Sequence, residues 1–150
     1  MSSEEREQKL IEYEKRINNL TQEEWEPLLK YIPLIKETNY FGEMVYDISD
    51  AEFKQFPFSK PSELVSNFVD DYYKFKFGVP FDWVKWVEQF REMEEKLDFD
   101  TLDLVSKTKY IFALIRQDRF VDNLLVSCFQ DGLILEILES IKKDVDKKYK

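Results

Sequence analysis

The stretch that decides the fold is residues 102–141, which read LDLVSKTKYIFALIRQDRFVDNLLVSCFQDGLILEILESI. Apolar residues recur in it at steps of three and four, the spacing that places them on one face of an α-helix. A charged break at 116–119 and a glycine, Gly132, divide it into three helical runs. Gly132 suits a stop between helices because glycine tolerates a positive φ. The stretch therefore predicts three amphipathic helices that bury their apolar faces.

The same periodicity extends toward the N-terminus. Apolar residues at helical spacing occur over residues 10–20, 25–32, 64–75 and 83–97. Together with the C-terminal runs they predict an all-α fold, a globular bundle of six or seven helices. A chain of 150 residues without an internal repeat or linker suits a single domain over 1–150. We expect residues 1–8 and 145–150 to fray.

Four positions predict where helices begin and end. Thr21 and Glu24 have the spacing of a capping box, which predicts a helix start. Pro33 should end or kink that helix, because proline removes a backbone donor. Pro61 suits the first position of a helix, where the missing donor costs nothing. Asp82 suits the N-cap of the helix that follows it.

Residues 39–60 are the least regular part of the sequence, and we expect them to form one long ordered loop. Residues 44–48 could be extended, but the sequence shows no partner strand for them. The loop also carries three aromatic side chains that we expect to pack against the core: Phe53, Phe56 and Phe58.

The composition excludes several kinds of active site. The chain has no histidine, one cysteine and three glycines. Without histidine it lacks nucleophiles activated by an imidazole and the usual zinc sites. The glycines are isolated, so no glycine-rich phosphate loop is present. We therefore expect no catalytic residue, no metal and no cofactor, and we expect Cys128, on an apolar helix face, to be buried and inert.

The net charge of −9 predicts which partners the chain avoids. An acidic protein repels a phosphate backbone, so we expect no direct nucleic-acid binding. No apolar run approaches the roughly 18 residues of a membrane helix, and the N-terminus lacks the layout of a signal peptide. We therefore expect a cytoplasmic protein without membrane contact.

The candidate binding residues lie in two places. The stretch Arg116-Gln117-Asp118-Arg119-Phe120 puts charges between two apolar helices and holds two of the five arginines of the chain. An arginine fork suits a carboxylate or phosphate, so the stretch predicts an anion site. Trp83 and Trp86 lie three residues apart, hence on one helix face, and could line its wall.

A structural interpretation of both places stays open. Asp118 could cap a helix while the arginines pair with acids such as Asp82 or Asp122. The two tryptophans could be core residues, as expected for most of the aromatic 16% of the chain.

The chain resembles a small bacterial family that is catalogued only as a domain of unknown function. The resemblance rests on the FDWxxW element at 81–86, on RQDRF at 116–120 and on Gly132 before the last helix, and it covers roughly residues 24–142. It implies an all-helical bacterial protein and no activity. Asn123 stands where family members usually carry a glycine, and asparagine tolerates left-handed geometry better than most residues.

Three functions follow as expectations, none of them specific to a substrate. The first is a non-catalytic protein-interaction or regulatory factor, which binds a protein partner or associates with itself. The alternative is a small-molecule or anion-binding pocket, with or without a catalytic role, near Arg116, Asp118, Arg119 and the two tryptophans. The third is an acidic mimic of nucleic acid, suggested by the net charge alone.

Overall fold

The computed structural model describes residues 3–45, 58–91 and 97–149. These residues contain eight α-helices, one 3-10 turn and two short strands. In chain order they are α1 (Ser3–Asn18), α2 (Gln22–Leu29), α3 (Tyr31–Lys36), β1 (Gly42–Val45), β2 (Phe58–Pro61), α4 (Glu63–Lys74), α5 (Trp83–Arg91), η1 (Phe99–Thr101), α6 (Leu104–Gln117), α7 (Leu124–Gln130) and α8 (Leu133–Lys148). The predicted helical bundle is confirmed, with eight α-helices among the described residues where six or seven were predicted. Residues 3–8 and 145–148, which were expected to fray, lie inside the terminal helices.

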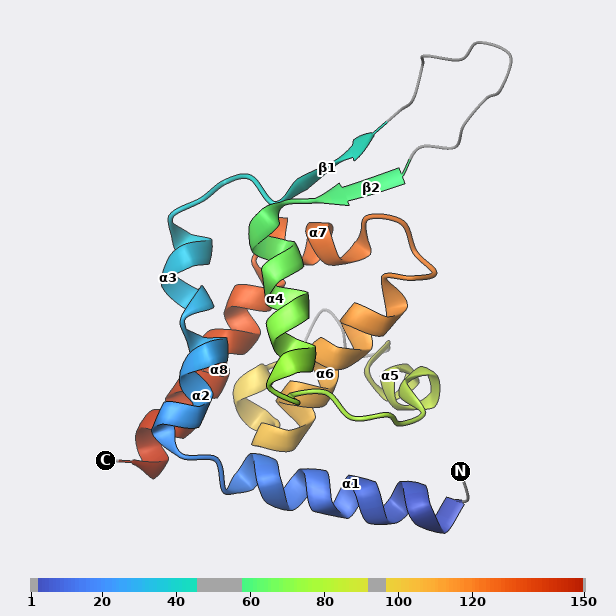
Figure 1. Ribbon diagram of the computed structural model, residues 1–150, viewed down its shortest axis with the longest axis vertical. Helices are drawn as coiled ribbons and strands as arrows, with labels where there is room; N and C mark the ends of the chain where they lie inside the picture. Colours follow the sequence, from blue (N-terminus) through green and yellow to red (C-terminus); the bar gives the residue numbers. More distant parts are fainter. Residues whose placement is uncertain (1–2, 46–57, 92–96, 150) are drawn as a thin grey trace.

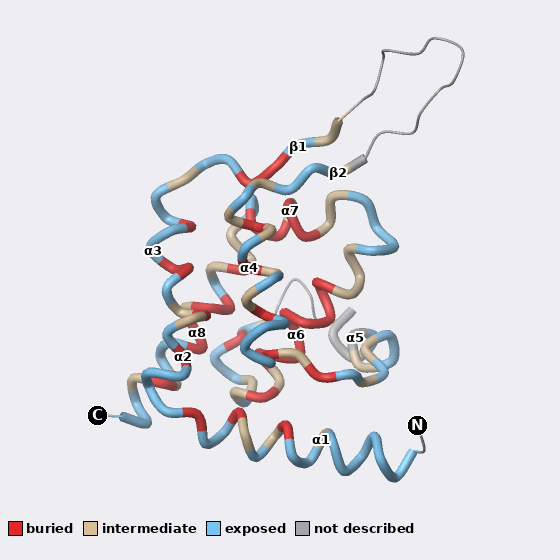
Figure 2. Tube along the Cα trace, viewed as in Figure 1, coloured by how far each residue is buried: buried red, intermediate tan, exposed pale blue. Residues whose placement is uncertain are grey.

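The core gathers around α8, which packs against α2, α3, α6 and α7. Its inward face is fully buried at Ile134, Ile137, Leu138 and Ile141. Figure 2 shows buried residues along the inner sides of α6 and α8, whereas the first turns of α1 are exposed. Each fully buried Ile or Leu stabilises the fold by roughly 1.5–3 kcal/mol. The helical periodicity of 102–141 thus corresponds to the centre of the bundle.

A second set of core contacts is aromatic. Phe68 of α4 meets Tyr31 and Phe129 edge-on, with ring centroids 5.2 Å apart in both pairs. Phe77 lies 5.6 Å from Trp25 and 5.7 Å from Tyr72. These rings belong to elements far apart in the sequence, so their packing fixes α4 against α2, α3 and α7. The expectation that most aromatic residues form the core is confirmed for these rings.

The break between α2 and α3 shows what Pro33 does. The capping box at the start of α2 is present, because Glu24 N lies 3.1 Å from Thr21 Oγ1 and Thr21 N lies 3.1 Å from Glu24 Oε1. The helix ends at Leu29, before Pro33, and Pro33 lies in the first turn of α3. A proline cannot donate to the carbonyl four residues earlier, here Leu29, and its ring clashes with it. The predicted disruption is therefore real, but it falls upstream of the proline.

The predicted long loop over 39–60 is wrong in part, because the described residues at its ends form a two-stranded antiparallel sheet. Gly42 pairs with Pro61 and Val45 pairs with Phe58. Gly42 has φ 143°, and a Cβ there would lie 2.7 Å from Lys60 O, so no other residue fits without a shift. The strands lie at the end of the molecule opposite α1 (Figure 1). Phe53 and Phe56 lie outside the described residues.

Pro61 is the last residue of β2, not the first residue of a helix as predicted. Ser62 is the N-cap of α4, and its hydroxyl accepts a hydrogen bond from Val65 N at 3.3 Å. Serine satisfies a free amide of the first turn, which proline cannot do. Ser62 N in turn donates to Phe41 O, so the proline is held in the strand.

The buried polar groups of α6 all have partners. Lys107, fully buried, donates to Asp144 Oδ2 at 2.5 Å and to Ser140 O at 3.3 Å. Thr108 Oγ1 donates to Val105 O and lies 2.8 Å from the hydroxyl of Tyr13. The hydroxyl of Tyr72 donates to Thr108 O. These bonds tie the first half of α6 to α1, α4 and α8. Separately, none of the described helices is long and apolar enough to span a membrane.

Candidate functional site

The connection between α6 and α7 is organised by Asp118. Its carboxylate accepts a hydrogen bond from Leu125 N, in the first turn of α7, at 2.9 Å. Asn123 has φ 64°, the left-handed conformation that asparagine tolerates, and it reverses the chain before α7. Gly132 has φ 86° between α7 and α8, as predicted for a glycine stop. The structural corner considered from the sequence is therefore present, with Asp118 as a helix cap.

The arginines of this corner do not make the ion pairs that the structural interpretation required. Within the described part of the chain, no salt bridge includes Arg116 or Arg119. Arg116, half-buried in the last turn of α6, places its guanidinium 6.0 Å from the centre of the Phe112 ring. Arg119 is exposed. Asp82, one of the proposed partners, instead caps α5, with Lys85 N 3.4 Å from its Oδ1.

The two tryptophans of α5 have different surroundings. Trp86 packs against the bundle, with its ring 5.7 Å from Phe81 and 6.1 Å from Tyr110. Trp83 instead stacks on Phe120, with centroids 6.2 Å apart and planes at 28°. Although they lie one turn apart, only Trp83 reaches the corner that carries the arginines.

The Trp83–Phe120 pair belongs to an exposed apolar surface. Phe120 is 78% exposed, the largest exposure among the large apolar side chains of the described residues. Its chain neighbour Val121 is 47% exposed, and Val84, next to Trp83, is 49% exposed. We call Trp83, Val84, Phe120 and Val121 the aromatic ridge. Contiguous exposed apolar surface can mark an interaction site, which makes this surface a candidate.

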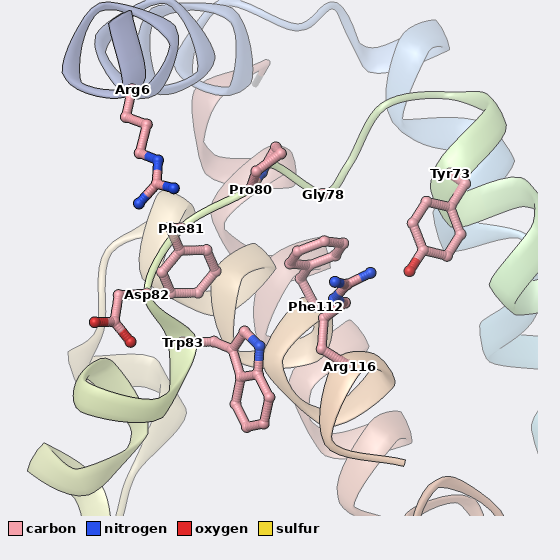
Figure 3. A pocket seen from close by; sticks show the side chains of 9 residues that line it. All are labelled: Arg6, Tyr73, Gly78, Pro80, Phe81, Asp82, Trp83, Phe112 and Arg116. Carbon is pink, nitrogen blue, oxygen red and sulfur yellow. The ribbon is translucent and has the colours of Figure 1, made fainter. Parts of the chain in front are cut away.

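Beside the ridge lies a cavity of about 550 Å³. Its walls come from four parts of the fold (Figure 3). The segment before α5 and its first residue contribute Gly78, Pro80, Phe81, Asp82 and Trp83. Helix α6 contributes Phe112 and Arg116, α4 contributes Tyr73, and α1 contributes Arg6. The volume is within the range of small-molecule sites, about 300–1,000 Å³.

Gly78 is required by this geometry. A Cβ at this position would lie 2.2 Å from Cδ2 of the Phe112 ring, a distance that real contacts do not reach. The chain therefore passes directly over the ring because no side chain intervenes. The sequence identifies Gly78 only as a break in the helical pattern; its contact with Phe112 depends on a residue 34 positions away.

Arg6 lines the cavity, although nothing in the sequence pattern selects it as a binding residue. It lies in an exposed turn of α1 and has the ordinary appearance of a solvated helix residue. The later part of α1 is anchored through buried Tyr13 and Ile17, and Figure 3 shows Arg6 pointing from the first turns of α1 toward Phe81. No salt bridge among the described residues includes Arg6.

Of the residues predicted to bind, the cavity brings together only Trp83 and Arg116. Asp118 lines a separate, smaller cavity of about 240 Å³ between α4 and α7. Trp86, Arg119 and Phe120 are not part of the larger cavity wall. The cavity therefore contains two of the six predicted binding residues, and side chains of α1 and α4 complete its wall.

The structure offers little for covalent or metal chemistry. Burial raises the pKa of the Cys128 thiol to about 12, with Asp131 and Asp118 contributing, so the thiolate is scarce near neutral pH. In the residues that the structure covers, no group of three or more Cys, Asp or Glu side chains could hold a metal ion. What the site does provide is aromatic surface and guanidinium groups.

Comparison with known proteins adds a family but no activity. Neither the curated proteins nor the solved structures include a significant match. A family model described as a family of unknown function, DUF6508, matches residues 20–147. This range contains the FDWxxW and RQDRF elements and nearly all of the wall of the cavity, Arg6 excepted. The chain therefore belongs to DUF6508, a family of unknown function.

Proposed function

We propose that the chain is a non-catalytic, cytoplasmic interaction factor that docks a segment of a different protein on the aromatic ridge. The exposure of Phe120 carries the proposal. Phe120 is 78% exposed, and its ring stacks on that of Trp83. A large aromatic ring buries about 150–250 Å² when it is covered. A partner that covers Phe120 would therefore bury a large apolar area, as hot-spot residues of interfaces do.

The charges around the ridge favour a partner segment with acidic residues. Arg119 precedes Phe120 and Lys85 follows Val84, and no ion pair of the described chain uses either cation. The carboxylates Asp82 and Asp118 each accept a hydrogen bond from a helix amide, and Asp122 is exposed beside Val121. Lys85 and Arg119 are nevertheless the cations of this corner that can contact an acidic partner.

Other features support an interaction factor over the remaining candidates. The chain has no histidine, and its single thiol is buried with a raised pKa, which speaks against nucleophilic catalysis. Acids and bases alternate on α8, where Lys142 pairs with Asp146 and Lys143 with Asp100. Such mixed charge does not favour a nucleic-acid mimic, which needs a continuous acidic face.

The test is site-specific photocrosslinking in cells of the source organism. One variant carries the photoreactive residue at position 120, and the matched control carries it at position 34, where Leu34 is 43% exposed on α3. We expect a discrete crosslinked protein from position 120 only, joined through a segment that contains Asp or Glu. With that segment as a peptide, Phe120→Ser should weaken binding by at least about 2 kcal/mol, roughly 30-fold in Kd.

Three results would contradict the proposal. A crosslink of the chain to itself at position 120 would show self-association instead. Equal products from positions 120 and 34 would show unspecific contact. A peptide that binds Phe120→Ser as tightly as the native chain would show that the ridge does not carry the interaction. Leu34→Ser is the control for the peptide measurement and should bind normally.

A further inference from the structure

The aromatic ridge does not account for the cavity beside it, whose floor is apolar and fixed. The Phe112 ring lies 6.0 Å from Tyr73, 6.2 Å from Phe81 and 6.4 Å from Tyr72. Gly78 covers one edge of the ring with backbone alone. These contacts come from three separate elements, so the floor is already formed without a ligand. The Phe112 ring is itself buried, so it closes the bottom of the cavity, and a flat apolar group would contact the half-buried walls Phe81 and Trp83 above it.

Two guanidinium groups stand over this floor. Figure 3 shows Arg6 reaching in from α1 on the side of Phe81, and Arg116 on the side of Phe112 and Tyr73. The described residues give neither arginine an ion-pair partner. Arg116 lies over the face of Phe112, which holds the side chain by a cation–π contact and leaves its N–H donors for another acceptor.

The charge balance of the wall is positive, although the protein is acidic. Asp82 is the one acid among the wall residues, and it accepts a hydrogen bond from the backbone amide of Lys85. Lys109 lies 5.4 Å from the centre of Phe81, but it pairs with Glu14 at 3.8 Å and adds no free charge. Two cations against one engaged carboxylate favour an anionic ligand.

We infer that the cavity binds a small organic anion, a flat apolar body that carries one carboxylate or phosphate group. The apolar body lies between the half-buried rings of Phe81 and Trp83, and the anion accepts hydrogen bonds from the guanidinium groups of Arg116 and Arg6. An inorganic anion would leave the aromatic floor unused, and a neutral aromatic compound would leave the guanidinium groups unused. The inference does not rest on the proposed function, because its test uses the chain without any protein partner.

The experiment uses the full chain and probes that separate the two halves of the ligand. 2-Naphthoate and 2-naphthyl phosphate carry the flat body with a carboxylate or a phosphate. 2-Naphthamide carries the same body without charge, and acetate and inorganic phosphate carry only the charge. Binding is followed by backbone and indole NMR shifts, in which Trp83 responds and the buried Trp25 serves as an internal reference.

We expect saturable binding of 2-naphthoate, of 2-naphthyl phosphate or of both, and the better of the two identifies the anion. The amide should bind at least about tenfold more weakly, because it forms no charge-assisted hydrogen bond. Acetate and inorganic phosphate should show no saturation at the same concentrations. Arg116→Gln and Arg6→Gln should each raise the Kd at least about tenfold.

The matched control is Arg119→Gln, which removes an exposed arginine of the same corner that does not line the cavity, and it should change the Kd less than about twofold. The melting temperature of each variant confirms folding. Equal affinity for the amide and the carboxylate would overturn the inference, as would a folded Arg116→Gln chain that binds like the native one. Absence of saturation for both naphthyl anions up to about 10 mM would also overturn it.

Discussion

The two ends of α6 differ in how their cations are paired. Near the start of the helix, Lys107 is fully buried and donates to Asp144 and to Ser140 O. At its end, Arg116 is half-buried against Phe112, lines a cavity and forms no ion pair within the described chain. A buried charge is tolerated only when it is paired, so removal of one partner at the first end should be costly. Arg116 has only its contact with Phe112 to lose, and a cation without an ion pair beside an aromatic cavity is the better candidate for function.

The largest expected effect is at the start of α6, where Lys107 is buried and paired; we call this the closed end of the helix, and the end with Arg116 the open end. Asp144→Ala leaves the Lys107 ammonium buried without its carboxylate, and we expect it to lower the free energy of unfolding by about 3 kcal/mol. Asp146→Ala is the control on the same helix, because it breaks the exposed pair with Lys142. This pair should contribute less than about 0.5 kcal/mol. Urea unfolding at neutral pH measures both. Equal losses for the two variants would contradict a special role for the buried pair.

A smaller loss is expected from the glycine that shapes the cavity. Gly78→Ala places a Cβ 2.2 Å from a Phe112 carbon, and overpacking of this kind costs about 2 kcal/mol. Gly132→Ala tests the cost of a strained backbone and not of a steric clash, because its φ is 86° and nothing lies within 4 Å of the added Cβ. We expect about 1 kcal/mol there. If the Gly78→Ala variant has the same urea midpoint of unfolding as the native chain, Phe112 can move and the cavity floor is not rigid.

At the open end, removing the cation should hardly change stability. Arg116→Gln loses only its contact with Phe112, so we expect the free energy of unfolding to change by less than about 1 kcal/mol. Thermal and urea unfolding of this variant give the direct comparison with Asp144→Ala. A loss as large as that of Asp144→Ala would show that Arg116 is a structural residue, and the contrast between the two ends would fail.

The smallest effect concerns pH, at an exposed group near the closed end. Hydrogen bonds from Ser140 and from Lys143 lower the pKa of Asp100 below its ordinary 3.8. A carboxyl with a lowered pKa stabilises the fold above its unfolded pKa, and this contribution is lost as the pH falls through the folded value. The native chain should therefore be more stable than Asp100→Asn at pH 7. The difference should shrink below about pH 4. Urea midpoints across this range measure it, and a difference that persists to about pH 2 would be contrary.

Much of the fold could be predicted because it depends on local spacing. The apolar steps in 102–141 match α6, α7 and α8, and the caps Thr21, Asp82 and Gly132 act where they were expected. The strand at 42–45 could not be predicted with confidence, because its partner at 58–61 has no alternating pattern and pairs across an intervening segment. The ends of α2 and α4 were displaced by a few residues, because a proline acts on the turn before it and serine competes for the cap.

The site could be predicted only in part. Arg116 was selected as a charge between two apolar helices and Trp83 as one of two tryptophans on one helix face, and both line the cavity. Arg6 and Tyr73 looked like ordinary surface residues, because the helices that carry them approach α6 only in the folded chain. The expected ion pairs of Arg116 and Arg119 are absent from the described residues, since Asp82 and Asp118 cap helices instead.

The sequence by itself determined the helical class, the position of the central helices and the absence of histidine-based chemistry. These properties depend on composition and on steps of three and four residues, which any reader of the chain can count. Only the tertiary structure decided which cation is neutralised and which is left available. That choice depends on Asp144 lying beside Lys107 and on α1 bringing Arg6 to the cavity of Arg116. Pairing energies depend on distances between side chains remote in sequence, and those distances exist only once the helices have packed.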